Sequence, residues 1–89
     1  MNRQPPDTDL GAAPGIVEHC VRDALERYFD DLGGAEPHAL HAMVLQSAER
    51  PLLEMVLKRT EGNQSQAAAW LGINRNTLRR KLLEHKLTE

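Results

Sequence analysis

The segment that decides the fold is GNQSQAAAWLGINRNTLRRKL, at residues 62–82. Two asparagines, Asn63 and Asn74, each precede a run of residues that favours helix, and asparagine is among the best helix N-cap residues. Gly72 stands between the two runs, where glycine readily takes the left-handed conformation that ends a helix. The pattern predicts two short helices joined by a tight turn.

The first of these helices is expected at residues 64–71 and the second from 75 to about 84. Gln66 occupies the third helical position, from which its side chain can complete a capping-box-like pair with Asn63. The alanines at 67–69 provide the small residues that two crossing helices need. The residues expected on the inward face are Trp70, Leu71, Ile73, Leu78 and Leu82.

The second short helix is basic, which is typical of a helix-turn-helix whose last helix lies in a DNA groove. Arg75 at its tip is the best candidate for a base-edge contact, bidentate to guanine, while Asn63 and Ser65 are expected to touch the DNA backbone. On charge alone, a solvated helix face is an equally good interpretation. The combination of two caps, the glycine turn and the alanines favours DNA. The residues expected to contact it are Asn63, Ser65, Gln66, Asn74, Arg75, Asn76, Thr77, Arg79, Arg80 and Lys81.

The charge is divided along the 89-residue chain, although its net value is only −2. Residues 1–57 have a net charge of −6, and residues 58–89 have a net charge of +4. Such asymmetry suggests an acidic scaffold with a basic working end, for which phosphate is the natural counter-surface.

Two longer helices are expected ahead of this region, at residues 16–32 and 37–60. Gly33 and Gly34 should end the first, and Pro37 is suited to begin the second. Pro51 lies inside the second helix, where we favour a kink over the start of a new helix. The predicted organisation is all-α: a flexible segment at 1–15, dimerisation helices at 16–61 and a helix-turn-helix at 62–89.

The first helix has two adjacent apolar stripes. Burying both requires neighbouring helices around a wider part of its circumference than one small chain can supply. A homodimer that packs two copies of the first two helices supplies those neighbours, with a compact monomer as the alternative. The residues expected in the dimer core are Val17, Val21, Leu25, Tyr28, Phe29, Leu40, Val44, Leu52, Met55 and Val56.

Several other classes of protein are disfavoured. No stretch is apolar enough to span a bilayer, and the N-terminus has no signal-peptide pattern. Cys20, the only cysteine, excludes an internal disulfide, suits a cytoplasmic location and is expected to be an inert buried thiol, with an intermolecular pair as the alternative. His38 and His41 have a spacing compatible with a shared metal, but surface histidines are the favoured interpretation. We expect no enzyme activity, no cofactor and no metal.

The motifs GNQ-x-x-AA and GINR-x-TLR-[RK]-KL, within residues 51–82, closely resemble the factor for inversion stimulation (Fis) family of nucleoid-associated DNA-binding proteins. The likeness extends more weakly over residues 16–87. It implies an intertwined homodimer of four-helix subunits, a kink at Pro51, and recognition helices closer together than one turn of DNA. Such spacing requires DNA bending, with deformability contributing to the reading of degenerate sites. Double-stranded DNA and a second copy of the chain are the implied partners, and RNA polymerase is a further candidate.

Two departures from the family pattern matter. Gln66 replaces an arginine and Leu83-Glu84 replaces a lysine pair, so some backbone affinity is expected to be lost. Invertase-stimulating members carry a β-hairpin arm ahead of the first helix, and no two-strand pattern is visible here. We therefore expect DNA binding and bending without invertase-type recombinase as a partner.

Two rival interpretations remain open at this point. A related motif lies at the C-terminal end of large enhancer-binding transcriptional activators. In the first alternative, this chain is a fragment that resembles the C-terminal domain of such an activator. A helical protein-interaction module with incidental DNA binding is the other, and the steep salt dependence of phosphate binding distinguishes it.

Overall fold

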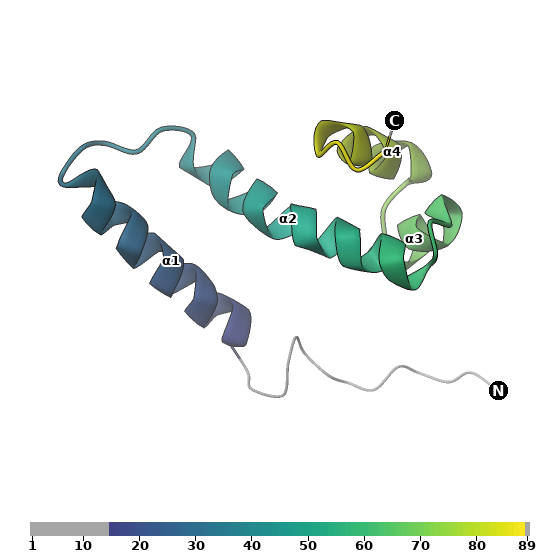
Figure 1. Cartoon of the computed structure of the whole chain (residues 1–89), viewed down its shortest axis with the longest axis horizontal. Coiled ribbons are helices and arrows are strands. Elements are labelled where there is room, and N and C mark those ends of the chain that lie inside the picture. Colours follow the sequence, from purple (N-terminus) through teal and green to yellow (C-terminus); the bar gives the residue numbers. More distant parts are fainter. Residues whose placement is uncertain (1–14, 89) are drawn as a thin grey trace. The chain divides into compact units, whose positions relative to one another are not determined.

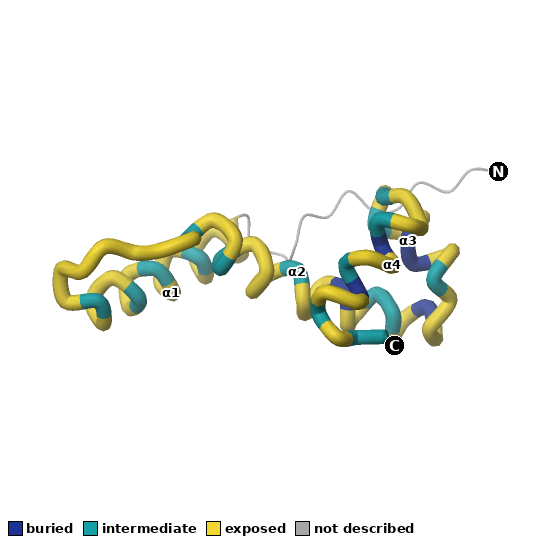
Figure 2. The backbone as a smooth tube through the Cα atoms, turned by 90° about the horizontal axis from the view of Figure 1, so that it is seen from above, coloured by how far each residue is buried: buried dark blue, intermediate teal, exposed yellow. Residues whose placement is uncertain are grey.

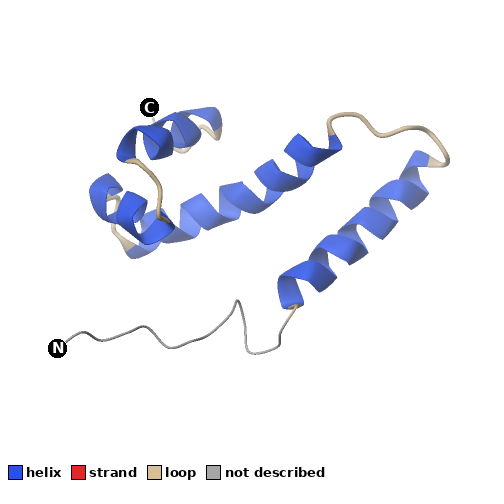
Figure 3. Cartoon of the chain, turned by 180° about the vertical axis from the view of Figure 1, so that it is seen from behind, coloured by secondary structure: helices blue, strands red, loops and turns tan. Residues whose placement is uncertain are grey.

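The computed structural model describes residues 15–88, and these residues contain four helices and no strand (Figures 1 and 3). The expectations for residues 1–14, the flexible segment and the missing arm, lie outside the described residues. The helices are α1 (Ile16–Leu32), α2 (Leu40–Arg59), α3 (Gln64–Leu71) and α4 (Arg75–Glu84). The all-α fold class is confirmed.

Helix α2 begins three residues later than predicted. Ala39 precedes it with a φ of 49° and a ψ of 40°, which is the left-handed region. A residue in that conformation cannot lie within a right-handed helix, so Pro37 stays in the loop. Further along, α2 continues unbroken through Pro51, which rules out a new helix there.

The chain divides into two compact units, residues 1–38 and residues 39–89, of which 15–38 and 39–88 are described. The first holds α1, and the second holds α2, α3 and α4. This boundary differs from the predicted one at 61/62, because the C-terminal half of α2 packs with the two short helices.

Few residues of the second unit are buried (Figure 2), and almost all of them are aliphatic. Leu53 of α2 and the α4 residues Leu78 and Leu82 are fully buried around the alanines Ala67 and Ala68 of α3. Because these alanines have no side chain beyond Cβ, α3 can pack against both α2 and α4. The partly buried residues around this core are Val56, Leu57, Leu71, Ile73 and Leu87.

Trp70 lies outside this core, so its predicted inward placement is wrong. It is 57% exposed. Ala67, Ala68 and Leu71 define the inner face of α3, and at about 100° per residue Trp70 and Ala69 fall outside that arc. The inner face of α3 is thus formed mainly by two alanines, and Trp70, its largest side chain, lies on the outer side.

The three helices of the second unit end in the same way, with a left-handed residue followed by a hydrogen bond that spans five residues. After α3, Gly72 has a φ of 72° and Ile73 N–H donates to the carbonyl of Ala68 at 3.1 Å. After α4, Lys86 is left-handed and Leu87 N–H donates to Leu82 at 2.8 Å. The endings of α3 and α4 turn the next apolar residues, Ile73 and Leu87, onto the core.

Helix α1 has no buried residue within the single chain. Its bounds match the prediction, and Gly33 ends it with a φ of 59°. Its two apolar stripes therefore remain at least partly exposed in one chain. Cys20 is also exposed, so the expected burial of its thiol is not present in the subunit.

At the left-handed helix ends, replacing glycine by alanine should destabilise the fold, whereas replacing another residue by glycine should stabilise it. Gly72→Ala should lower the free energy of unfolding by about 1–2 kcal/mol, because alanine is strained at this φ although a Cβ there meets nothing within 4 Å. Glu61→Gly is the matched variant, since Glu61 holds a φ of 53° after α2, and it should stabilise by up to about 1 kcal/mol. Urea unfolding at one fixed protein concentration measures both. Equal signs for the two variants would contradict this account.

Candidate nucleic-acid interface

The two short helices begin with the predicted asparagine caps. The Asn63 side chain accepts a hydrogen bond from Gln66 N–H at 3.0 Å, and the Asn74 side chain accepts one from Asn76 N–H at 2.7 Å. The return half of the capping box is not formed, because Asn63 N–H already donates to the Thr60 carbonyl at 3.0 Å. Gln66 is therefore an exposed residue whose side chain is not used in the cap.

Most of the predicted DNA-contacting side chains are on the surface of the second unit. Thr77 and Lys81 are half-buried, and the other eight residues of the set are exposed. Among residues 15–88, no carboxylate lies within ion-pair distance of Arg75, Arg79 or Arg80. These three guanidinium groups are thus available to an external anion.

A polar hollow of about 650 Å³ brings part of the predicted set together. Arg75, Asn76 and Arg79 line it from α4. Gly62, Gln64 and Thr88, which the sequence analysis did not select, line the rest. Gln64 is the first residue of α3, next to the cap Asn63. Its place beside a predicted cap is the sequence feature that could have identified it as a lining residue. Arg80, Asn63 and Ser65 do not line this hollow.

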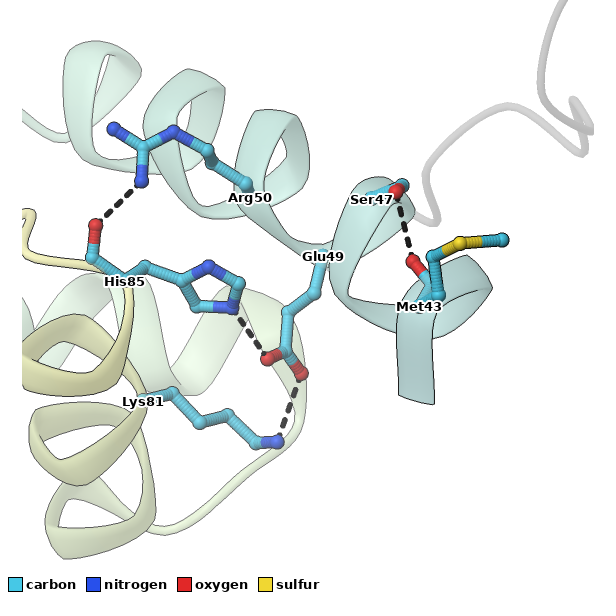
Figure 4. Close-up of polar contacts among 6 residues, drawn as sticks. All are labelled: Met43, Ser47, Glu49, Arg50, Lys81 and His85. Atoms are coloured by element: carbon cyan, nitrogen blue, oxygen red, sulfur yellow. Dashed lines mark hydrogen bonds and ion pairs between the residues drawn. The ribbon is translucent and has the colours of Figure 1, made fainter. Parts of the chain in front are cut away.

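Among residues 15–88, Lys81 is the charged residue of the predicted set that has an internal ion-pair partner (Figure 4). Its Nζ lies 2.8 Å from Oε2 of Glu49 on α2, and its side chain is only 28% exposed. The half-buried face of α4 that carries Lys81 is distinct from the exposed positions of Arg75 and Arg79. The structure therefore gives Lys81 a contact between helices that its charge alone did not suggest.

His85 completes this contact from the end of α4 (Figure 4). Its Nε2 lies 2.9 Å from Oε1 of Glu49, and since a carboxylate only accepts, the ring donates. Arg50 also donates from Nη1 to the backbone carbonyl of His85. Three polar contacts thus join the middle of α2 to the last turn of α4 and to the residue that follows it.

The charge state of Glu49 reflects these partners. The hydrogen bond from Lys81, followed by the one from His85, holds the pKa of the Glu49 carboxyl below its ordinary value of 4.5, and partial burial opposes them. The ionised form is therefore the one that the fold favours.

The predicted dimer-core residues have two different environments. Val56 packs against the core of α2, α3 and α4, so its side chain is used within the chain. The other nine are exposed or half-buried, with Val17, Phe29, Leu52 and Met55 among the large exposed apolar residues. No helix within residues 15–88 has the length and apolar character to cross a membrane.

Comparison with known proteins gives the family. Residues 44–85 match the model of a family described as bacterial regulatory proteins of the Fis family. A Fis-like DNA-binding protein of Ralstonia nicotianae is 55% identical over 71 residues, which cover 80% of this chain and 92% of the relative. The chain belongs to the Fis family.

Other relatives agree with this assignment. A Fis-like DNA-binding protein of Neisseria meningitidis serogroup A is 51% identical over 80% of this chain and 90% of its own length. The DNA-binding protein Fis of Mannheimia haemolytica is 48% identical over 73% of this chain and 66% of its own length. The resemblance found in the helix-turn-helix motifs is thus confirmed. The Fis family is one of regulatory proteins and not an enzyme family.

The Glu49 contacts predict a defined effect of acid on stability. Because the folded-state pKa of Glu49 is lowered, its stabilisation is complete above about pH 4.5 and is lost as the pH falls through that lowered pKa. Glu49→Gln should lower the free energy of unfolding by about 1–3 kcal/mol at pH 7 and lose less stability below pH 4.5 than the unmodified chain. Urea unfolding between pH 7 and pH 3 measures this difference.

Glu54→Gln is the control for this measurement. Glu54 lies on the same helix, and its pair with Arg50 at 3.8 Å is about half exposed, so its removal should change stability little. Parallel pH curves for Glu49→Gln and the unmodified chain would contradict the assignment.

Proposed function

We propose that this chain is a homodimeric DNA-binding and DNA-bending protein of the Fis type, a nucleoid-associated transcriptional regulator. The observation that carries the proposal is the exposed set of Arg75, Asn76 and Arg79 at the start of α4, around a polar hollow shared with the start of α3. This arrangement belongs to a helix-turn-helix in a family whose relatives are named as DNA-binding proteins.

DNA is the partner that the charges fit. The chain is acidic as a whole, with a net charge of −2, but three unpaired arginines lie on one short helix of the described region. The first N–H groups of α4 and its dipole add positive potential at the tip that carries Arg75. Arg75 is the proposed base-reading residue, and Arg80 is the proposed phosphate contact. Neutralised phosphates release counterions, so affinity should fall steeply with salt.

A second copy of the chain is the proposed partner of α1. This helix has two apolar stripes but no buried residue within one chain, and Ile16, Val17 and Phe29 are each close to half exposed. On α2, Leu45, Leu52 and Met55 are also exposed. Apolar surface of this extent is costly to leave in water and is typical of helices that pack in a dimer.

DNA bending is expected when a dimer holds two α4 helices against the same duplex. If the two α4 helices are closer together than one turn of DNA, both can enter successive grooves only when the duplex curves. Sequences that bend easily would then be preferred even where no base is touched, which accounts for degenerate sites. The proposed location is the nucleoid in the cytoplasm, with RNA polymerase as a candidate further partner.

The DNA proposal predicts two different mutational effects on α4. Arg75→Ala should weaken binding to a preferred duplex by about 1–3 kcal/mol and relax the preference at one base pair in each half-site. Arg80→Ala should weaken all duplexes by a similar factor and lower the slope of log affinity against log salt by about 0.9. Fluorescence anisotropy with preferred and scrambled duplexes over a salt series measures both. The base-reading role is wrong if Arg75→Ala affects all duplexes alike.

The dimer proposal predicts that a charge on the apolar face of α1 separates the subunits. Sedimentation equilibrium should give about twice the chain mass of 10.0 kDa for the unmodified protein. Val21→Glu should shift the mass to that of one chain, since an unpaired carboxylate in an apolar interface is strongly unfavourable. His19→Glu adds the same charge at an exposed position of the same helix and should leave the dimer intact. A monomeric unmodified protein at micromolar concentration would contradict the proposal.

A further inference from the structure

Glu49 contacts α4 through both oxygens of its carboxylate (Figure 4). Oε2 accepts from Lys81 at 2.8 Å and Oε1 accepts from His85 at 2.9 Å. Lys81 lies in the last turn of α4 and His85 directly follows the helix with right-handed backbone angles, so the two partners, four residues apart, lie on the same side. They lie 32 and 36 residues along the chain from Glu49, so these bonds are tertiary contacts.

The apolar contacts of α4 do not define its orientation in the same way. Leu78 and Leu82 anchor the helix in the core and are fully buried. Burial of aliphatic side chains is strongly favourable but not directional, so it restrains the depth of a helix better than its rotation or its sliding. Hydrogen bonds to a charged group are both stronger and directional. The bonds to Glu49 therefore supply the restraint that the leucines lack.

The outer face of α4 depends on that restraint. Lys81 and His85 lie on the inner face, next to Leu78 and Leu82, and Arg75 and Arg79 are exposed. A rotation of α4 that broke the bonds to Glu49 would carry both arginines around the same axis. Arg50 of α2 adds a contact to the backbone carbonyl of His85, so the end of α4 is held by two neighbouring residues of α2.

We propose that Glu49 is a positioning residue for DNA recognition, which sets the orientation of α4 and so the aim of Arg75. The inference rests on the proposed DNA binding, and it gives a role to an acidic residue that itself would repel DNA. Its removal should thus have an effect opposite to that expected from charge. Removing a negative charge near the DNA strengthens the attraction to phosphate. A change in the orientation of α4 instead weakens the preference for one base sequence over another.

The experiment compares Glu49→Gln with Glu54→Gln, which remove the same charge from the same helix. A preferred duplex is first selected with the unmodified protein from a random pool, and affinities for it and for a scrambled duplex are then measured by anisotropy. Binding is measured at a temperature at which thermal unfolding followed by circular dichroism shows each variant folded. His85→Gln, which removes one of the two bonds, serves as a second variant if Glu49→Gln is poorly folded.

The specificity ratio, preferred over scrambled, decides the outcome. Glu49→Gln should lower it about three- to tenfold and His85→Gln by a smaller factor, with Glu54→Gln unchanged. A partly unfolded protein loses the same factor on both duplexes, so simple destabilisation leaves the ratio unaltered. An unaltered ratio in a folded Glu49→Gln variant overturns the positioning role while the DNA-binding proposal stands. If the unmodified protein binds no duplex at low salt, the proposed function itself fails.

Discussion

Ala67 and Ala68 let α3 lie against α2 and α4 at once, because no side chain beyond a methyl group separates the backbones. Around this point of close approach, Leu53, Leu78 and Leu82 form a core of only a few fully buried residues. A core of this size contributes little stability, so the helix caps, helix ends and hydrogen bonds also help to determine the arrangement of the helices. The asparagine caps start the two short helices, and the left-handed endings stop them and turn Ile73 and Leu87 onto the core.

Electrostatic contacts divide the basic residues of α4, together with His85 directly after it, into two groups. Lys81 and His85 are directed at Glu49 and join α4 to α2. Arg75, Arg79 and Arg80 have no carboxylate partner among the described residues and remain available to phosphate. We therefore propose that part of the charge of α4 fixes the position of the helix and that the rest meets a polyanion. Under this proposal an acidic scaffold is compatible with DNA binding, because one of its carboxylates, Glu49, holds α4 in place.

Helix α1 gains no buried residue from its own chain. The exposed valine, isoleucine and phenylalanine side chains on it are hard to reconcile with a lone subunit in water, and they are the physical reason to propose a second copy. The free energy of folding of such a protein is linked to its concentration, since the interface forms only in the dimer. In the proposed dimer, the spacing of the two α4 helices and any bend in the DNA depend on how the two copies assemble.

By itself the sequence determined the local structure. The bounds of α1, α3 and α4, both asparagine caps and the glycine ending of α3 follow from short-range preferences that residues express wherever they stand. The family was also legible, because its motifs lie within one continuous segment. Only the tertiary structure decided which faces point inward: it left Trp70 outside, packed Val56 against the core of the second unit and paired Lys81 with Glu49. These choices depend on which residues meet across the fold, and helical periodicity places a residue on a face without saying what that face will touch.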